Sequence, residues 1–310
     1  MSGPVVVLAG GTGGAKLARG MLDVVGADQL VVIANTGDDV EIYRAYVSPD
    51  PDLVTFWLAD EIDQRGWGLA GDTFRVMDGL RRLGVDVWFN LGDRDLAIGV
   101  ERARRLADGE RLTTAHAAIA QALGVRTPVL PMTDQPVRTR VLARGRWWPF
   151  QEFMIKARGE GPVDEVEFRG AGAAQPTPEV LAALAQARAI VIGPSNPVIS
   201  IGPILALAQL HKAIQAAAAP VVAVSPLVRG RSVKGPTDSF LAWAGQPLTS
   251  SGIAMLYAGL IDGLVADEPT ELVPVLEAGV LMDSAAARAR VAEEALRFTL
   301  ALAEPTRSGD

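Results

Sequence analysis

The chain has 310 residues, enough for one large α/β domain or two modest ones with a sizeable core. Its 29 Lys and Arg against 36 Asp and Glu give a net charge of -7, which disfavours non-specific nucleic-acid binding. The chain has no cysteine, so disulfides, thiolate metal sites and cysteine nucleophiles are excluded and a reducing compartment fits. Since neither a signal peptide nor a long uncharged apolar run is present, we expect a cytoplasmic protein that contacts neither nucleic acid nor membrane.

The first predicted element is a buried strand over residues 5–9, followed by the turn GGTGGAKL and a helix. Glycines let the backbone bend sharply and approach a ligand closely. Backbone N–H groups at the start of a helix bind phosphate oxygens well. The turn matches neither a P-loop nor a strict dinucleotide fingerprint, and a tightly packed βα turn is the alternative. The substrate-binding residues predicted here are Gly10, Gly11, Thr12, Gly13 and Gly14.

Apolar β-branched runs alternate with helical patterns along the rest of the chain. This alternation predicts an α/β fold with a Rossmann-like, doubly wound, mostly parallel sheet. The predicted strands cover residues 5–9, 30–34, 85–89, 129–131, 189–193 and 221–225. The predicted helices include residues 73–83, 101–106, 114–123, 178–187, 204–217 and 285–302.

Two regions interrupt the alternation. Residues 52–84 are mostly helical and carry Trp57 and Trp67, so we expect a small helical insertion there. Residues 137–172 are richer in Trp, Phe, Arg and Gly, which favours an antiparallel ribbon or loop. We expect a single Rossmann-like domain over residues 1–310 that includes both regions.

Polar loops follow several predicted strands, and ligands of open α/β sheets gather at the carboxyl ends of strands. The sequence NTGDD follows the second strand, NLGDRD the third and GPSNP the fifth. Carboxylates in such number suit Mg²⁺, which binds through one or two of them and shares the substrate phosphates. For each single aspartate, a turn or N-cap role is the alternative. The aspartates concerned are Asp38, Asp39, Asp50, Asp52, Asp93 and Asp95.

The GPSNP loop has an unusual density of turn-forming residues. Ser195, Asn196 and Ser200 are placed to donate hydrogen bonds to a phosphate or a base, and a rigid strand-to-helix connection is the alternative. His116 and His211 fall inside predicted helices, where packing explains them better than catalysis. No Ser/His/Asp arrangement is indicated, so hydrolysis by an activated serine is unsupported.

In this order, the loops resemble the CofD/FbiA family, the 2-phospho-L-lactate transferases of coenzyme F(420) biosynthesis. The matching segments span nearly the whole chain: GGTGGAKL (10–17), NTGDD (35–39), SPDPD (48–52), GDRDLA (92–97), FQEF (150–153), GPSNPVISIGPIL (193–205), AVSPLV (223–228) and KGPTD (234–238). The glycine turn alone is a weak signal, whereas the combination is highly specific.

The resemblance implies a Mg²⁺-dependent homodimer that uses two small-molecule substrates. The donor is a guanosine-diphospho conjugate of lactate or of enolpyruvate. The acceptor is Fo, the deazaflavin 7,8-didemethyl-8-hydroxy-5-deazariboflavin. Its terminal ribityl hydroxyl attacks the phosphorus that carries the three-carbon acid, which releases GMP and forms coenzyme F(420)-0 or its dehydro form.

Residue roles are carried over by position. The glycine turn is expected to hold the donor phosphates. Asp52 and Asn90 match positions associated with Fo, and Mg²⁺ is expected near Asp39 and Asp52. The catalytic residues implied are Asp52, Asp39 and Asp93. The further substrate-binding residues implied are Asn35, Ser195, Asn196 and Ser200, of which the last three are expected at the guanosine part.

The chain also departs from the family pattern. Ile98 and Gly99 stand where Thr-His usually follows GDRDLA, Gln135 replaces a usual aspartate, and Ser239 replaces a basic residue. An alternative is a regulator of the YvcK type, which shares the fold and binds nucleotide-sugars without known transfer. A nucleotide-binding dehydrogenase is disfavoured because Asn35 stands where an acidic residue would hold the ribose.

Overall fold

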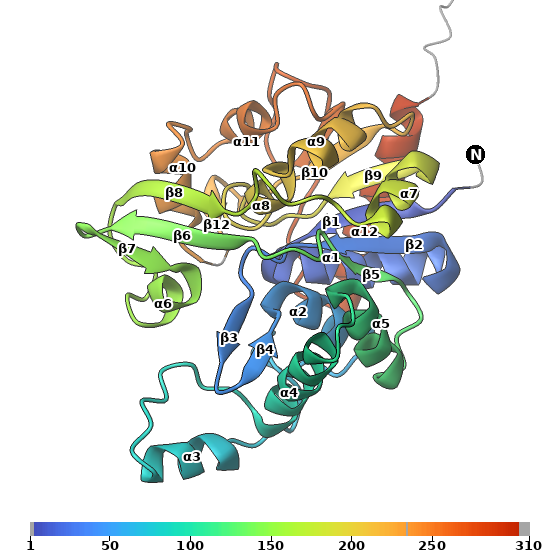
Figure 1. Cartoon of the computed structure of the whole chain (residues 1–310). Helices are drawn as coiled ribbons and strands as arrows, with labels where there is room; N and C mark the ends of the chain where they lie inside the picture. The colour runs from blue at the N-terminus through green and yellow to red at the C-terminus, as the bar shows by residue number, and fades with distance from the viewer. Residues whose placement is uncertain (1–2, 234, 304–310) are drawn as a thin grey trace, which may run out of the picture.

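A seven-stranded parallel sheet forms the centre of the computed structural model, which describes residues 3–233 and 235–303 (Figure 1). The predicted doubly wound α/β fold is confirmed. β1 pairs with both β2 and β9, so the strand that precedes the glycine turn lies inside the sheet. In sheet order the strands are β14 (Val275–Glu277), β13 (Gly263–Ala266), β10 (Val221–Val224), β9 (Ala189–Ile192), β1 (Val5–Ala9), β2 (Leu30–Ala34) and β5 (Val129–Pro131).

Alternate residues of each strand face opposite layers of helices, as the two-residue period of a strand requires. Val5 and Val7 pack with α1 (Gly11–Val25) and α12 (Ala285–Leu302) on one face. Val6 and Leu8 pack on the other face, in the cluster that contains the buried sides of α7, α9 and α11. The bounds of these three helices are Pro178–Gln186, Ala208–Gln215 and Ser250–Leu256.

The remaining elements lie around this body. The helices are η1 (Ala27–Gln29), α2 (Pro49–Leu58), α3 (Arg75–Arg82), α4 (Asp93–Ala107), α5 (Leu112–Ala122), α6 (Phe150–Ile155), α8 (Gly202–Leu205) and α10 (Thr237–Trp243). The short strands are β3 (Val40–Ile42), β4 (Ala45–Val47), β6 (Arg138–Ala143), β7 (Arg146–Pro149), β8 (Val163–Arg169), β11 (Leu227–Val228) and β12 (Arg231–Ser232). In the described part of the chain, no helix is long and apolar enough to cross a membrane.

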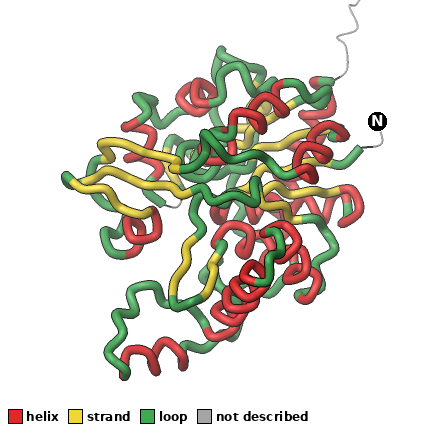
Figure 2. The backbone as a smooth tube through the Cα atoms, viewed as in Figure 1, coloured by secondary structure: helices red, strands yellow, loops and turns green. Residues whose placement is uncertain are grey.

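The predicted ribbon at residues 137–172 is confirmed as a three-stranded antiparallel sheet in the order β7-β6-β8. Figure 2 shows these strands extending to the left of the main sheet. A small core lies beneath them, in which Phe153 of α6 and Phe240 of α10 meet edge to face at 6.1 Å. This core also buries Val198 and Ile199 and so fixes the loop that follows β9.

The strand prediction at residues 85–89 is wrong. Since β2 pairs directly with β5, the sheet has no position for another strand between them. The segment belongs to none of the described strands: Val85 is 40 % exposed, and the Phe89 N–H donates to the Tyr43 hydroxyl. Of the central sheet, β13 and β14 were not predicted. The short strands β3, β4, β11 and β12 outside that sheet were not predicted either. The helix predicted at 204–217 is two helices, α8 and α9.

Residues 52–84 lie in two different environments. Val54 and Trp57 of α2 belong to the core beneath the main sheet. Met77 of α3 instead packs with Leu91 and Leu96 in a small separate cluster. α3 lies away from the main sheet, at the bottom of Figure 1. Treating 52–84 as one insertion, and 1–310 as one domain, stays a prediction.

Candidate functional site

A cavity of about 660 Å³ lies at the carboxyl ends of β1, β9 and β10. Gly10, Pro194 and Ser225 line it and lie just after these three strands. This is the sheet edge at which the sequence places a ligand. Further lining residues come from 47–56, 67–68, 88–95, 150–155, 226–237 and 280–282.

The structure brings most of the predicted site residues into this cavity, but not all of them. Those that line it are Gly10, Gly11, Thr12, Gly13, Asp52, Asn90, Ser195, Asn196 and Ser200. Those that do not are Gly14, Asn35, Asp39 and Asp93.

The glycine turn is shaped by close backbone contacts. Gly11 has a φ of +61°, a conformation that residues with a side chain rarely adopt. A Cβ atom on Gly13 would lie 1.9 Å from the Pro194 carbonyl oxygen. The packing alternative therefore accounts for part of the glycine content, because the 193–200 loop presses against the start of α1. Thr12 and Gly13 line the cavity where first-turn N–H groups have no intrahelical partner, so this end of α1 also suits an anion.

The Asp50 carboxylate lies at the start of α1. Its Oδ1 accepts from the Gly11 N–H at 2.7 Å, and its Oδ2 accepts from the Asn35 side-chain amide at 2.9 Å. Asn35 thus acts from behind the cavity wall by holding Asp50. Burial raises the pKa of Asp50 to about 6, although these two hydrogen bonds favour its charged form.

Asp38 is a second buried carboxylate close to Asp50. It is 7 % exposed, lines the cavity, and its Oδ1 has no hydrogen-bond partner. Burial and, after it, the nearby charge of Asp50 raise the pKa of Asp38 well above its usual value. A buried unpaired carboxylate oxygen beside a second carboxylate is costly unless a cation joins the pair.

Asp39 is turned away from the cavity. Its Oδ1 accepts from the Ser48 hydroxyl at 2.7 Å and its Oδ2 from the Tyr46 hydroxyl at 2.9 Å. Burial raises the pKa of Asp39 to about 7, and these two hydrogen bonds act in the opposite direction. What separates Asp39 from Asp50, whose oxygens are also both hydrogen-bonded, is that Asp39 does not line the cavity. The metal and catalytic roles of Asp39 that the resemblance implies therefore stay predictions.

Asp52 lines the cavity but is part of a buried ion pair. Both of its oxygens accept from Arg102, a fully buried residue of α4, and Arg102 also donates to the Tyr46 carbonyl at 2.9 Å. His116 of α5 lies 3.9 Å from the carboxylate. Burial, then the charge of Arg102, lowers the pKa of His116 to about 3, so the imidazole is neutral. Asp52 thus joins α2 to α4, with its charge already balanced.

The two aspartates of the GDRD segment have different surroundings. Asp93 Oδ1 accepts from the Val76 N–H at 3.0 Å, and its Oδ2 accepts from the Thr73 hydroxyl at 2.5 Å. The Thr73 hydrogen bond is the largest cause that lowers the pKa of Asp93. Asp93 therefore caps the start of α3. This is the capping role that the sequence offered as the alternative to a metal-binding or catalytic role. Asp95, two residues later in the same first turn of α4, lines the cavity instead.

We call Ser195, Asn196, Ser200 and Thr237 the serine side of the cavity. Asn196 Oδ1 accepts from the N–H groups of Val198 and Ile199, and its amide donates to the Thr237 hydroxyl at 3.4 Å. Asn196 thus holds its own loop in shape. The Ser195 hydroxyl is buried without a hydrogen-bond partner, so its donor is available to a ligand.

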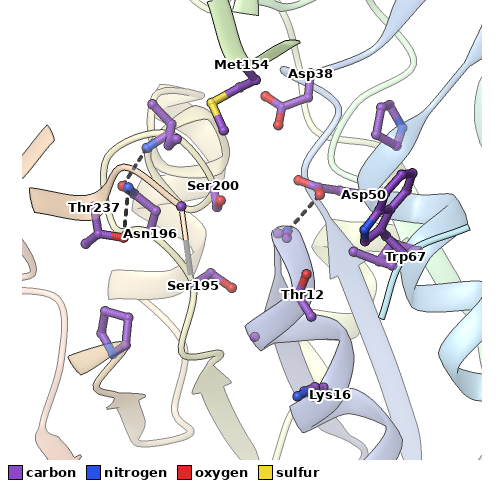
Figure 3. A pocket seen from close by; sticks show the side chains of 18 of the residues that line it. Thr12, Lys16, Asp38, Asp50, Trp67, Met154, Ser195, Asn196, Ser200 and Thr237 are labelled. Carbon is purple, nitrogen blue, oxygen red and sulfur yellow. Dashed lines mark hydrogen bonds between the residues drawn. The ribbon is translucent and has the colours of Figure 1, made fainter. Parts of the chain in front are cut away.

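We call Asp52, Trp67, Asn90 and Asp95 the aspartate side. Figure 3 shows Trp67 and Asp50 to the right of the start of α1, and Asn196, Ser200 and Thr237 to its left. Trp67 is 53 % exposed although it lines the cavity, and its indole stacks on Arg65 at 4.5 Å. The glycine turn therefore lies between a hydrogen-bonding side and a side that carries acidic and aromatic groups.

The cavity wall carries more acidic than basic groups. Four carboxylates line it: Asp38, Asp50, Asp52 and Asp95. Lys16 is the only cationic residue among the described lining residues, and its ammonium donates to the Met282 carbonyl at 2.9 Å. Lys234, in the matching KGPTD segment, lies outside the described residues. An anionic substrate would meet net repulsion here unless a cation came with it.

Asp38 and Asp50 are the residues best placed to hold such a cation. Across residues 3–233 and 235–303, no three or more His, Cys, Asp or Glu side chains are grouped to enclose a metal ion. Mg²⁺ suits this arrangement, because it usually keeps several waters and binds one or two carboxylates together with substrate phosphates. The unpaired Asp38 Oδ1 is the observation that fits it.

Sequence reasoning gave no individual role to several residues in or behind the cavity wall. Asp38, Asp50 and Asp95 belong to the acidic group, and choosing among its members needed their hydrogen-bond partners. Thr237 lies in the KGPTD segment, which was recognised only as part of a match. Arg102, deep inside α4, carries no sequence signal that separates it from the exposed arginines beside it.

Comparison with known proteins gives consistent matches over nearly the whole chain. The family model described as "2-phospho-L-lactate transferase CofD" matches residues 5–289. A phosphoenolpyruvate transferase of Kitasatospora aureofaciens is 38% identical, over 98% of this chain and 99% of its own length. A 2-phospho-L-lactate transferase of Methanosarcina mazei is 36% identical, over 85% of this chain and 87% of its own length. A crystal structure of a UPF0052 family protein from Bacillus halodurans covers 89% of both chains with a TM-score of 0.57 at 18% identity, a likeness of fold alone.

Proposed function

The chain belongs to the CofD family of 2-phospho-L-lactate transferases, and we propose that it transfers a phosphorylated three-carbon acid to Fo in coenzyme F(420) biosynthesis. The group moved is 2-phospholactyl or phosphoenolpyruvyl, carried by a guanosine-diphospho donor. The acceptor is the ribityl hydroxyl of Fo, and GMP leaves. The proposal includes both groups because some relatives are named phosphoenolpyruvate transferases and others 2-phospho-L-lactate transferases.

The observation that supports this proposal best is the arrangement of one cavity around the start of α1. A transfer between two substrates needs two binding surfaces that meet at a site for the moving phosphoryl group. Residues of the serine side and Trp67 of the aspartate side lie on opposite sides of the glycine turn (Figure 3), and all the residues of both sides line the cavity.

We place the donor against the glycine turn and the serine side. The first-turn N–H groups of α1 and the positive end of its dipole suit the diphosphate. The buried Ser195 hydroxyl, which has no partner, supplies another donor, and Ser200 and Thr237 line the same side. The guanosine part would extend over Asn196 and Thr237.

We place Fo on the aspartate side. A flat deazaflavin ring stacks well on an aromatic face, and Trp67 is exposed at the cavity mouth. Asn90 and Asp52, the positions that the resemblance associates with Fo, both line this side. Asn90 Oδ1 already accepts from Arg81 at 2.7 Å, so its amide group is the one left for a ligand.

Mg²⁺ remains part of the proposal, with Asp38 and Asp50 as the residues that would hold it in place of Asp39 and Asp52. When bound, it would neutralise charge on the diphosphate and act as a Lewis acid on the phosphoryl group. The protein itself then binds the donor, orients the acceptor and excludes water. Positioning and charge stabilisation are sufficient for phosphoryl transfer without a covalent intermediate.

The test is a mass-spectrometric assay with Fo and Mg²⁺, in which guanosine-diphospho donors carrying a lactyl, an enolpyruvyl or a glyceryl group compete. The glyceryl donor is included because the three acids differ by few atoms. We expect release of GMP and one preferred phosphoacyl-Fo product. Asp38→Asn is expected to raise the Mg²⁺ concentration needed for half-maximal rate, whereas Asp108→Asn, the same change at the exposed end of α4, is not. Folded protein that forms no product from any donor contradicts the transferase proposal.

A homodimer and a cytoplasmic location stay proposals that the resemblance supports. The absence of cysteine suits a reducing compartment. The YvcK-like alternative, a nucleotide-sugar-binding regulator without transfer, is less well supported, because Asp52 and the GDRD segment are present and both contribute to the cavity. Light scattering of the purified protein tests the dimer.

A further inference from the structure

We infer that Asp95 is the general base of the reaction, the group that takes the proton from the ribityl hydroxyl of the acceptor. This inference rests on the proposed function. It begins from the four carboxylates of the cavity wall, Asp38, Asp50, Asp52 and Asp95. A general base needs a carboxylate oxygen that can accept from the substrate.

Two of the four carboxylates have both oxygens engaged. Asp50 accepts from the Gly11 N–H and from Asn35, and Asp52 accepts from Arg102 with both oxygens. In both residues, each carboxylate oxygen already accepts a hydrogen bond from a protein group. Both are therefore better suited to fix the shape and charge of the cavity than to receive a proton.

The remaining two carboxylates differ in position. Asp38 lies beside Asp50, where a cation would use its free oxygen. Asp95 is half-buried in the first turn of α4, and among the described residues none donates a hydrogen bond to its carboxylate. Asp95 thus lines the cavity and has carboxylate oxygens that accept no hydrogen bond from the described residues.

The backbone at Asp95 is well fixed although its side chain is not. The Asp72 carboxylate accepts from the N–H groups of Thr73, Arg94 and Asp95, at 2.8, 2.9 and 3.1 Å. Asp72 therefore anchors the start of α4 to the segment that carries Trp67. A residue that lines the cavity from a fixed helix turn, and whose carboxylate accepts no hydrogen bond from the described residues, is suited to meet a substrate hydroxyl.

The charges that face Asp95 come from three segments. The pKa of Asp95 is shifted by three charged neighbours: Asp52 on α2, Asp72 before α3 and Arg102 on α4. His116 on α5 is neutral. Burial, then Asp52 and Asp72, raises the pKa of Asp95 to about 7, with Arg102 acting against them. A base whose pKa lies near the working pH gives the best proton transfer.

The step balances without a further reactant. The hydroxyl oxygen of Fo forms a bond to the phosphorus that carries the three-carbon acid, and the bond from this phosphorus to the GMP phosphate oxygen breaks. The hydroxyl proton moves to the Asp95 carboxylate and then to water. GMP leaves with the electron pair of the broken bond.

The test compares Asp95→Asn, Asp95→Glu and Asp108→Asn in single-turnover GMP release, with Fo binding and thermal unfolding measured on each protein. Asp95→Asn keeps the shape and removes the acceptor. We expect it to lower the rate by about 100-fold or more, while the Kd for Fo changes by less than about threefold. Asp95→Glu should recover part of the rate, and Asp108→Asn should match the parent.

The pH profile gives the readout that a structural role would not change. The ionised form of Asp95 is the active one, so the parent rate should rise with pH through a pKa near 7. This rise should be absent in Asp95→Asn. The inference is overturned if Asp95→Asn keeps the parent rate and profile, or if it loses Fo binding and stability in proportion to rate. If the parent forms no product with any donor, the proposed function and this inference fail together.

Discussion

The two sides of the cavity are positioned by different forces. On the serine side, backbone meets backbone, and a Cβ on Gly13 would lie 1.9 Å from the Pro194 carbonyl oxygen. On the aspartate side, elements are joined by charge, through the fully buried pair of Asp52 and Arg102. The serine side should therefore be sensitive to added volume, and the aspartate side to lost charge.

Removing the charge of Asp52 is expected to have the largest effect on stability. Asp52→Ala leaves Arg102 buried without its partner, which costs about 3–5 kcal/mol in the free energy of unfolding. Chemical denaturation measures this loss. The family resemblance associates Asp52 with catalysis and with Fo binding. Its ion pair with Arg102 also gives it a structural role.

A double-mutant cycle separates these two roles. The Asp52→Asn/Arg102→Met variant removes both charges and is expected to be more stable than either single variant. Stability that falls additively would show that the pair does not hold α2 to α4. A stable double variant that fails to bind Fo would assign Asp52 to the acceptor as well.

Added volume on the serine side should have the next largest effect. Gly13→Ala forces the 193–200 loop away from α1 and is expected to cost about 1–3 kcal/mol, with weaker donor binding. Gly79→Ala in α3 is the matched control, since nothing lies within 4 Å of its added Cβ. Equal stability of the two variants would contradict the close-contact account.

The sequence predicted the central sheet well and its periphery less well. β1, β2, β9 and β10 are apolar segments of four or five residues, which can be recognised without knowledge of their partners. Residues 85–89 have the same pattern but belong to none of the described strands, because the adjacent position beside β2 is taken by β5. Which strand occupies a sheet position depends on the whole topology, so a local pattern could not decide it.

The candidate site was predictable at the level of segments rather than of single side chains. The glycine turn, GPSNP and GDRD all reach the cavity. Which aspartate lines the cavity depends on contacts formed across the fold: both oxygens of Asp39 are held by Tyr46 and Ser48, whereas Asp38 Oδ1 has no hydrogen-bond partner. Neighbouring residues of the same type thus take opposite roles.

Asp93 offers a smaller test of this point. Asp93→Ala removes the cap of α3 and is expected to lower the Tm slightly, because the Val76 N–H and the Thr73 hydroxyl lose their acceptor. Turnover per folded molecule should stay close to that of the parent. A drop in kcat of more than about tenfold would return Asp93 to the catalytic role implied by the resemblance.

Ser195→Ala is expected to have the smallest effect on stability. Its hydroxyl has no hydrogen-bond partner, so its loss should change the free energy of unfolding by less than about 0.5 kcal/mol. Donor affinity should fall by about 0.5–1.5 kcal/mol if the hydroxyl donates to the diphosphate. Titration calorimetry with GDP measures this, and unchanged affinity would remove Ser195 from the donor contacts.

The central claim is that the donor and the acceptor occupy opposite sides of the start of α1, with the cation held by Asp38 and Asp50. Anomalous scattering from Mn²⁺ in crystals grown with GDP and Fo tests it most directly. We predict a metal peak at these two carboxylates, GDP on the serine side and Fo on the aspartate side. A peak beside Asp39, or both ligands on one side, would contradict the account.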